Sequence, residues 1–460
     1  MVRKLVNIGE HFFSKNLTVI MYNILSARSW TITKRSFLFM LYISLSYIHA
    51  EIDTLWTRDY SIDDSCFAGT GDYDIVKLNS ENFILLADFI WDDGDSLSMV
   101  LGLLKIDISG NVIWSHRIDS TGVAYNSVNI EYTSDGGFII GTKYIKNSVS
   151  RFCIIKTDST GEQDWQSTFL WGSANELTSI GTAVDGGYTL TGYSYQSGNI
   201  TGKFVKIDSL GNEMWEKDFS GVVTSQEETF SGNFLLGLTL PSRVVMINEF
   251  GDSLWTKQYF NIGYPAFHMI TIDDHGGYIL VGNSDLPDGY GNNDIVILKI
   301  DSLGNDEWHM NYGTAQNDYG YSIINTVTEG YAIAGVLNNK AYVLLIDSLG
   351  NEEWSSTMAN SNSFMYDIVE SGVNKYITIG RNESLVPNAV SVWSIFSSCI
   401  GDLDNDGYIT PEDVTVLMYS IMNGEDFMDN ADMNYDTSMD IIDLLMLIDI
   451  ENSNIDETCH

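Results

Sequence analysis

The sequence predicts a mainly β protein in which seven four-stranded antiparallel blades form a β-propeller, followed by a small α-helical module. A tryptophan-led unit of 40 to 58 residues recurs seven times between residues 51 and 398, and each unit contains short apolar runs separated by glycine-containing turns. Residues 399–460 then change to helical spacing between acid-rich loops. A period of that length with several strands per unit is typical of propeller blades. A two-sheet sandwich array is the competing architecture.

The first 50 residues form an N-terminal extension that ends in a predicted signal peptide. Lys34 and Arg35 precede an apolar core at about residues 36–48, and cleavage is predicted after Ala50. This order of basic, apolar and small residues is typical of secretion signals. The apolar run is short for a membrane span, so a membrane anchor is the alternative, and no membrane contact is expected after cleavage.

Each repeated unit, within residues 51–398, opens with a tryptophan on a predicted strand. These tryptophans are Trp56, Trp114, Trp165, Trp215, Trp255, Trp308 and Trp354. Glycines in the Gly-Gly and Gly-Asn turns supply the positive φ that tight hairpins need. Each Trp strand is predicted to be the fourth strand of the preceding blade. The first unit lacks a strand before its tryptophan and the seventh lacks a Trp strand after it, so strand 53–60 should pair antiparallel with strand 390–397 and close the ring.

The hairpin that leads into each tryptophan has the form Asp-x-x-Gly-Asn-x-x-Trp, as in residues 208–215. It resembles the tryptophan-docking repeat of quinoprotein-like propellers and is similar to the Asp-box of sialidase-like propellers. Both resemblances imply the propeller fold, and neither implies a catalytic activity or a ligand. Because the hairpin aspartates follow the repeat, we interpret them as turn residues rather than catalytic ones. They are Asp107, Asp158, Asp208, Asp301 and Asp347.

Two twelve-residue acid-rich loops lie thirty residues apart near the C-terminus. Positions 1, 3, 5, 7, 9 and 12 of such a loop can supply the oxygens that Ca²⁺ requires. In the first loop these positions are Asp402, Asp404, Asp406, Tyr408, Thr410 and Asp413. In the second loop they are Asp432, Asn434, Asp436, Ser438, Asp440 and Asp443. Apolar residues at helical spacing follow both loops, which favours two Ca²⁺ sites over a solvated acidic tail. Thr437 replaces the turn glycine of the second loop, so its affinity should be lower.

The repeated loop and helix resemble a type I dockerin over about residues 399–452. Dockerins are calcium-dependent modules that dock extracellular bacterial proteins onto the cohesin modules of a scaffold protein. The resemblance implies that loop positions 10 and 11 and helix positions 17 and 18 contact the cohesin. These residues are Pro411, Glu412, Met418 and Tyr419 in one half, and Ile441, Ile442, Ile448 and Asp449 in the other. The two halves differ, so a dual binding mode is not implied.

The resemblance also implies that the two ends of the dockerin-like domain, residues 399–460, lie close together. A disulfide between Cys399 and Cys459 is therefore expected, which agrees with export to an oxidising compartment. Cys66 and Cys153 lie in separate repeats and are expected to remain unpaired thiols. No Cys-x-x-Cys motif or histidine cluster suggests zinc.

The formal net charge of −39 argues against nucleic acid or an anionic membrane as a partner, because phosphates would be repelled. On the propeller, we expect one face to carry the regular turns and the other to carry irregular loops at 61–72, 88–97, 142–150, 193–202, 283–293 and 313–320. Aromatic side chains in these loops could stack on sugar rings. They are Trp91, Trp171, Tyr193, Tyr195 and Tyr290.

Two functions remain open at the level of sequence. The first is a secreted recognition or structural propeller that its dockerin-like module attaches to an extracellular, and in some cases cell-surface, scaffold. The alternative is an extracellular polysaccharide hydrolase or lyase with its active site on the irregular-loop face. Acidic pairs such as Asp92/Asp93 and Asp273/Asp274 could serve glycoside hydrolysis, but no catalytic residue can be assigned.

Overall fold

The computed structural model describes residues 51–61, 66–68, 73–92, 97–118, 124–146, 148–196, 198–263, 265–273, 276–285, 293–358, 362–382, 389–398, 414–418 and 421. The chain divides into the units Met1–His49 and Ala50–His460, and every described residue belongs to the second. The predicted N-terminal extension with its signal peptide, both calcium loops and the Cys399–Cys459 pair lie outside these residues.

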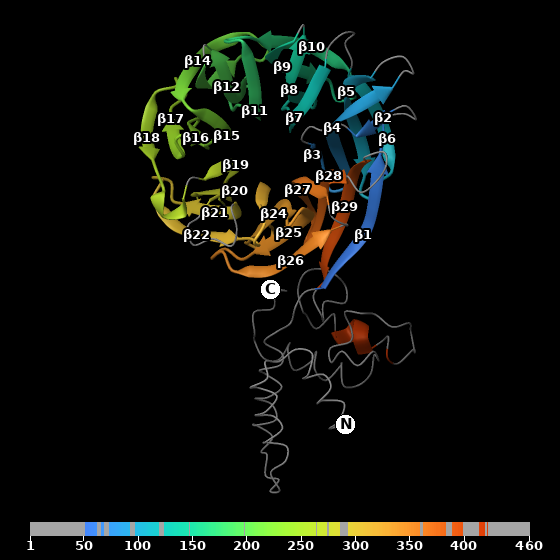
Figure 1. Ribbon diagram of the computed structural model, residues 1–460. Coiled ribbons are helices and arrows are strands. Elements are labelled where there is room, and N and C mark those ends of the chain that lie inside the picture. Colours follow the sequence, from blue (N-terminus) through green and yellow to red (C-terminus); the bar gives the residue numbers. More distant parts are fainter. Residues whose placement is uncertain are drawn as a thin grey trace. The chain divides into compact units, whose positions relative to one another are not determined.

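Seven antiparallel sheets follow one another around a ring (Figure 1), which confirms the predicted propeller and excludes the sandwich array. The first three blades contain β2 (Cys66–Ala68), β3 (Asp74–Lys77), β4 (Asn82–Asp92), β5 (Leu97–Asp107) and β6 (Val112–Ile118); β7 (Ala124–Tyr132), β8 (Phe138–Lys146), β9 (Val149–Thr157) and β10 (Gln163–Phe169); and β11 (Ala174–Thr182), β12 (Tyr188–Gln196), β13 (Asn199–Ile207) and β14 (Glu213–Ser220). In the first blade, the innermost strand is split into β2 and β3, which both pair with β4.

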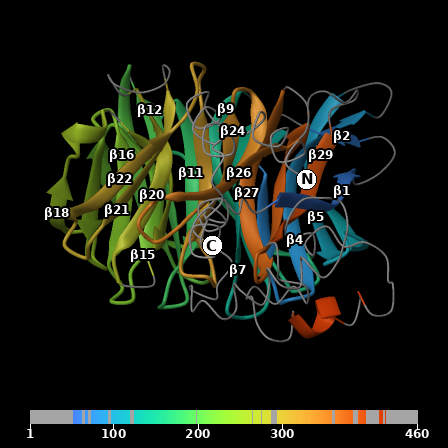
Figure 2. The ribbon, with the colours of Figure 1, turned by 90° about the horizontal axis from the view of Figure 1, so that it is seen from below.

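The remaining four blades have the same order of strands. They contain β15 (Val222–Glu228), β16 (Phe234–Thr239), β17 (Arg243–Ile247) and β18 (Ser253–Lys257); β19 (Ala266–Ile272), β20 (Tyr278–Ser284), β21 (Asp294–Ile300) and β22 (Asp306–Tyr312); β23 (Tyr319–Asn325), β24 (Tyr331–Leu337), β25 (Lys340–Ile346) and β26 (Glu352–Met358); and β27 (Ser363–Gly372), β28 (Lys375–Asn382), β29 (Ala389–Ser398) and β1 (Glu51–Tyr60). The turned view shows the blades from the side (Figure 2). A short 3₁₀ helix, η1 (Phe260–Ile262), follows β18.

The ring closes as the sequence predicts. The first strand of the chain, β1, pairs antiparallel with β29 over its full length, from Glu51 opposite Ser398 to Tyr60 opposite Val390. It thereby becomes the outermost strand of the seventh blade. The two ends of the propeller segment are joined in one sheet, so neither β1 nor β29 is left as an unpaired edge.

Each tryptophan lies on the outer strand of one blade, and all but Trp354 pack against the hairpin of the next; Trp354 lies in the apolar cluster between the sixth and seventh blades. Trp165 on β10 lies against Gly211 in the β13–β14 turn, and Trp56 on β1 lies against Gly110 in the β5–β6 turn. The Trp56 Nε1–H also donates to the Ile108 carbonyl at 3.0 Å. The tryptophans therefore connect neighbouring blades, as in the docking hairpins that the sequence resembles.

The Gly-Gly turns use their two glycines for different reasons, which corrects the expectation that both supply positive φ. Gly136 has φ +87°, whereas Gly137 does not lie in the positive-φ region. A Cβ at Gly137 would lie 2.1 Å from the Thr157 carbonyl oxygen, and one at Gly187 would lie 2.3 Å from that of Ile207. The second glycine is needed because the neighbouring strand passes too close for a side chain.

The apolar core lies between the blades rather than within any one of them. Each of seven buried clusters combines side chains from two neighbouring sheets. Phe83 and Leu85 of the first blade, for example, meet Ile377 and Val392 of the seventh. Apolar burial of this kind makes each blade depend on both neighbours for its stability.

Three of the expected irregular loops are mostly strand. Segments 88–97, 142–150 and 193–202 contain the ends of β4 and β5, β8 and β9, and β12 and β13, respectively. Several polar residues of these segments are buried within the strands, among them Asp88, Thr142 and Ser194, so their polarity does not mark a loop.

Outside the propeller, residues 414–418 and 421 are helical. Leu417 is buried and Met418 is 45% exposed. The other predicted cohesin contacts lie beyond the described residues and remain predictions. Helices within the described ranges are all too short or too polar to cross a bilayer.

Candidate functional site: the central channel

The innermost strands of the seven blades surround a central channel of about 790 Å³. Six of these strands carry a β-bulge at the same position. A bulge re-aims a side chain out of the regular alternation. The bulged residues whose side chains are described all line the channel: Thr178, Thr224, His268, Tyr321 and Tyr366.

Four rings form an aromatic arc along one side of the channel, defined as Tyr73, His268, Tyr321 and Tyr366. Neighbouring ring centroids are 5.5 Å apart for His268 and Tyr321, 5.3 Å for Tyr321 and Tyr366, and 5.6 Å for Tyr366 and Tyr73. Tyr73 is buried behind the others at 2% exposure, whereas Tyr321 and Tyr366 are half-buried and His268 is exposed to the channel. The arc spans the first, fifth, sixth and seventh blades.

Two aspartates follow the arc residues of the first and seventh blades. The Ile75 N–H lies 2.8 Å from Asp74 Oδ1 and 3.1 Å from Asp367 Oδ2, so it donates to both carboxyls. Asp74 also accepts from the Ile130 N–H at 2.8 Å, and Ser322 Oγ–H donates to Asp367. The pair therefore ties the first blade to the second and the sixth blade to the seventh, across the ring closure.

The closeness of these carboxyls changes their ionisation. Burial raises the pKa of Asp74 well above its usual range, and the charge of Asp367 and a hydrogen bond between the two carboxyls raise it further. Like charges this close disfavour the ionisation of both carboxyls at once. Burial likewise raises the pKa of Glu131 to about 7 and that of Glu227 to about 8, with smaller contributions from Asp367 and Glu131, respectively.

The channel has few positive charges to balance these acids. Among the described residues, the lining contains the acids Asp74, Glu131, Glu227, Glu228 and Asp367, one lysine, Lys77, and no arginine. Lys77 Nζ donates to the Glu370 carbonyl at 2.5 Å. Burial lowers the pKa of His268, whose Nε2 lies 2.7 Å from Asn283 Oδ1, so its ring is neutral at pH 7. Acidic side chains therefore outnumber basic ones among the described lining residues.

The sequence predicted binding groups on the irregular-loop face rather than in the channel. The structure places only some of these residues near the channel. Tyr193 lines the channel, whereas Trp171 folds back onto its own blade, stacked on Phe169 with centroids 5.5 Å apart. Tyr195 is 37% exposed and contacts Tyr193. Asp273 is buried in an ion pair with Lys299 at 3.3 Å, which gives it a structural role. Tyr290, Asp93, Asp274 and the side chains of Trp91 and Asp92 are outside the described residues.

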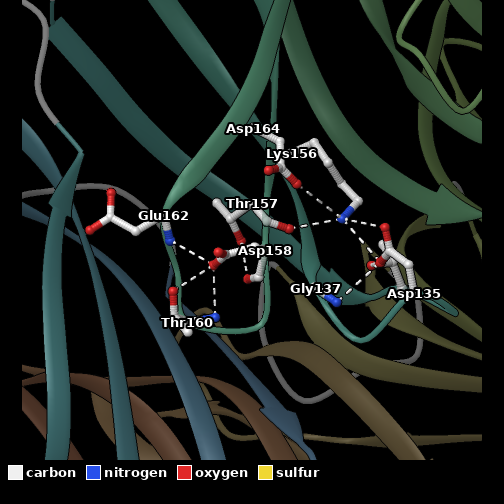
Figure 3. A network of polar contacts seen from close by, with 9 residues as sticks. Asp135, Gly137, Lys156, Thr157, Asp158, Thr160, Glu162 and Asp164 are labelled. Atoms are coloured by element: carbon white, nitrogen blue, oxygen red, sulfur yellow. Dashed lines mark hydrogen bonds and ion pairs between the residues drawn. The ribbon is translucent and has the colours of Figure 1, made fainter.

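The repeated hairpin aspartates have the structural role that the sequence suggested. In the β9–β10 turn, Asp158 Oδ1 accepts from the backbone N–H groups of Thr160 and Glu162 (Figure 3). The Thr160 hydroxyl also donates to Asp158 Oδ1 at 2.7 Å, and this bond, followed by the backbone ones, lowers the pKa of Asp158. In the same view, the buried Lys156 ammonium pairs with Asp135 of the Gly-Gly turn at 2.9 Å. These contacts hold turns together and leave no reactive group free.

The remaining expected features are only partly covered by the described residues. Cys153 is a free, fully buried thiol, as predicted, and burial raises its pKa above the usual range. The side chain of Cys66 is not described. No group of three His, Cys, Asp or Glu side chains suited to a metal ion occurs in the described part of the chain, which does not include the predicted calcium loops.

The channel residues were missed at the sequence level, although a signal for them exists. Residues 73–76 and 366–369 have the same sequence, Tyr-Asp-Ile-Val, in the first and last blades. This identity marks the two innermost strands that meet at the ring closure. Their proximity depends on the closed ring.

The fold and its channel define the chain as a seven-bladed β-propeller, and the comparison with one solved structure agrees. A streptogramin B lyase structure is 12% identical, with a TM-score of 0.51, covering 76% of this chain and 99% of that one. The WD40 domain of Neurospora crassa Pan2 is 11% identical, with a TM-score of 0.49, covering 76% and 97%. At these identities the likeness shows the fold alone. No protein-family model and no curated protein sequence matches the chain.

Proposed function

We propose that this protein is a secreted, calcium-dependent adaptor whose C-terminal module docks onto a cohesin-bearing scaffold and whose propeller is a recognition module. The observation that carries the docking half is the pair of acid-rich loops in register at 402–413 and 432–443, each followed by an apolar run at helical spacing. Two loops with oxygen donors at the same positions are matched to a hard cation such as Ca²⁺.

The helical segment 414–418 supports the assignment of the contact surface. Met418 is 45% exposed, whereas the adjacent Leu417 is buried. A large exposed apolar side chain on a secreted protein is a common element of protein–protein contacts. The recognition half is supported by the channel, because a concave site with aromatic and polar groups suits small-ligand binding better than a flat surface does.

The docking half is tested with the full-length protein and cohesin modules encoded in the same genome. Binding is expected in calcium and should be lost in chelator. Met418→Asp should weaken binding by about tenfold or more if Met418 is an interface anchor. Leu303→Asp is the matched control, because Leu303 is 66% exposed in a propeller hairpin. Absence of binding to any cohesin in calcium would defeat the adaptor assignment, and unchanged binding by Met418→Asp would place the contact in the second half, around Ile441 and Ile442.

A second candidate is a polysaccharide-degrading enzyme. It is favoured by one observation, the raised pKa values of about 7 for Glu131 and about 8 for Glu227. A carboxyl that remains protonated near neutral pH can act as the general acid in glycoside hydrolysis. Release of reducing sugar from a polysaccharide panel, abolished by Glu227→Gln, would establish this function. Binding of a polysaccharide without release of reducing sugar would support the recognition function instead.

A further inference from the structure

Two buried hydrogen-bond acceptors of the channel wall lack a donor among the described residues. The amide oxygens Asn129 Oδ1 and Gln226 Oε1 are buried and accept no hydrogen bond, although both residues line the channel. The Gln226 side chain is 91% buried, and its Nε2–H donates to the Thr189 carbonyl at 3.3 Å, which fixes the orientation of the amide. Unsatisfied buried acceptors cost free energy and are ordinarily paired.

The carboxyls of the lining add further acceptor oxygens. Glu131 and Glu227 influence each other's ionisation across the channel, and Glu131 also influences Asp74. Lys77 donates to a backbone carbonyl, and no arginine occurs among the described residues of the lining. A ligand that carries both positive charge and N–H donors would satisfy carboxyl and amide oxygens together.

The aromatic arc provides the second half of the recognition surface. Tyr321 and Tyr366 are half-buried at the channel wall. Aromatic faces attract cations within about 6 Å of the ring centroid and pack against the carbon skeleton of a ligand. The channel carboxyls and the aromatic faces therefore both favour a positively charged ligand.

We propose that the central channel binds the primary ammonium group of a small organic ligand, with the carboxyls and amide oxygens accepting its N–H groups and the aromatic arc packing against its carbon skeleton. The inference rests on the recognition role proposed for the propeller. The channel volume of about 790 Å³ is typical of small-molecule sites. A divalent metal ion would gain nothing from the aromatic arc, because it requires six to eight oxygens. An amino sugar and an aliphatic amine share the required chemistry.

The test is isothermal titration of the full-length protein in calcium-saturated buffer, so that the predicted C-terminal loops are already filled. The ligands are glucosamine, cadaverine and glucose, which is the neutral counterpart of glucosamine. Binding of glucosamine or cadaverine but not of glucose is expected. Tighter binding of glucosamine would identify an amino sugar as the source, and tighter binding of cadaverine an aliphatic amine. Equal binding of glucosamine and glucose, or no binding of either amine, would overturn the inference.

The variant Glu131→Gln/Glu227→Gln keeps the shape of the channel and removes two carboxyls. Loss of two carboxyls that can ionise against a bound ammonium group should weaken amine binding by about tenfold or more. Glu307→Gln is the matched control, because Glu307 is an exposed acid on the outer strand β22. Melting curves of all three proteins verify folding. Unchanged amine affinity in the double variant would overturn the inference.

Two further results separate this inference from its alternatives. If the wild type binds neither amine but binds one more calcium ion than the double variant, the channel is a metal site and the inference is wrong. Cohesin binding measured on the same preparation separates the two proposals. Cohesin binding without amine binding defeats only the channel inference, and amine binding without cohesin binding defeats only the adaptor.

Discussion

At the scale of single residues, an aspartate occupies the same position in several hairpin turns of the propeller. In one of these turns an asparagine takes its place. Asp208 Oδ1 accepts from the backbone N–H groups of Leu210 and Asn212 at 2.9 and 2.8 Å. In the β17–β18 turn, Asn248 occupies the same position and accepts from Phe250 and Asp252 at 3.0 and 2.8 Å. The turn therefore needs an acceptor oxygen rather than a negative charge.

This equivalence predicts different outcomes for two substitutions at Asp208. Asp208→Asn should lower the melting temperature only slightly, because the amide oxygen can accept both backbone bonds and only the exposed bond from Asn212 Nδ2 to Oδ2 is lost. Asp208→Ala should lower it, because two turn N–H groups lose their acceptor. Differential scanning calorimetry measures both. A loss of ligand binding in Asp208→Asn without a change in melting would instead indicate a functional carboxylate.

The turn glycines separate backbone strain from steric contact. Gly211 has φ +80°, and a Cβ there would lie 2.6 Å from Trp165 Cζ3. Gly186 has φ +84°, and a Cβ there would meet no atom within 4 Å. Gly186→Ala should cost about 1–2 kcal/mol of unfolding free energy from the left-handed backbone alone. Gly211→Ala should cost more, because Trp165 must also move, and equal costs in denaturant titrations would refute the docking role of Trp165.

At the scale of elements, the fold makes the seventh blade depend on the first strand of the chain. Deletion of residues 51–60 removes β1 and leaves β29 as an unpaired edge. It also removes Trp56 and Arg58, which bond to the β5–β6 turn of the first blade. We expect the truncated protein to melt less cooperatively or to aggregate, because exposed edge strands pair with other chains.

Calorimetry and light scattering together test this expectation. Deletion of residues 453–458, which lie between the dockerin-like repeat and Cys459, is the control for shortening the chain. If the protein lacking β1 melts like the full chain and stays monomeric, closure by β1 does not stabilise the ring.

At the scale of the whole molecule, the acids of the channel determine how stability depends on pH. The folded-state pKa values of Glu131 and Glu227, about 7 and about 8, exceed the ordinary glutamate value of 4.5. Between pH 4.5 and 8 the folded protein therefore holds protons that the unfolded chain has released, so the free energy of unfolding should fall as pH rises through this window. The pKa of Asp135 is lowered to about 2 by hydrogen bonds to Thr133 and Lys156, which outweigh its burial. Its contribution should be lost as pH falls from about 4 towards 2.

Maximum stability is thus expected near pH 4–5. Melting temperatures measured from pH 3 to 9 should decline above this range, and Glu131→Gln/Glu227→Gln should flatten the decline and melt higher than the wild type at pH 8. Glu307→Gln should reproduce the wild-type profile. A double variant with the wild-type slope would show that the channel glutamates are not the groups that titrate.

The sequence by itself determined the repeat, the number of blades, the turn residues and the pairing of the first strand with the last. The turns were predictable because they depend on local chemistry, such as positive φ at Gly211 and acceptor oxygens at Asp208. The closure was predictable because the seven units leave one unpaired strand at each end of the segment, and these two strands can pair only with each other. The calcium loops were identified from local spacing in the same way and remain predictions.

Only the tertiary structure decided what faces the channel. Asp74 and Asp367 are separated by most of the chain, and they meet because the closed ring places the first and seventh blades side by side. The bulges that turn His268, Tyr321 and Tyr366 inwards shift the alternation of each strand by one residue, so a pattern of period two assigns these side chains to the wrong face. The raised pKa values arise from the same closure, because burial and like charge both depend on which strands surround a carboxyl.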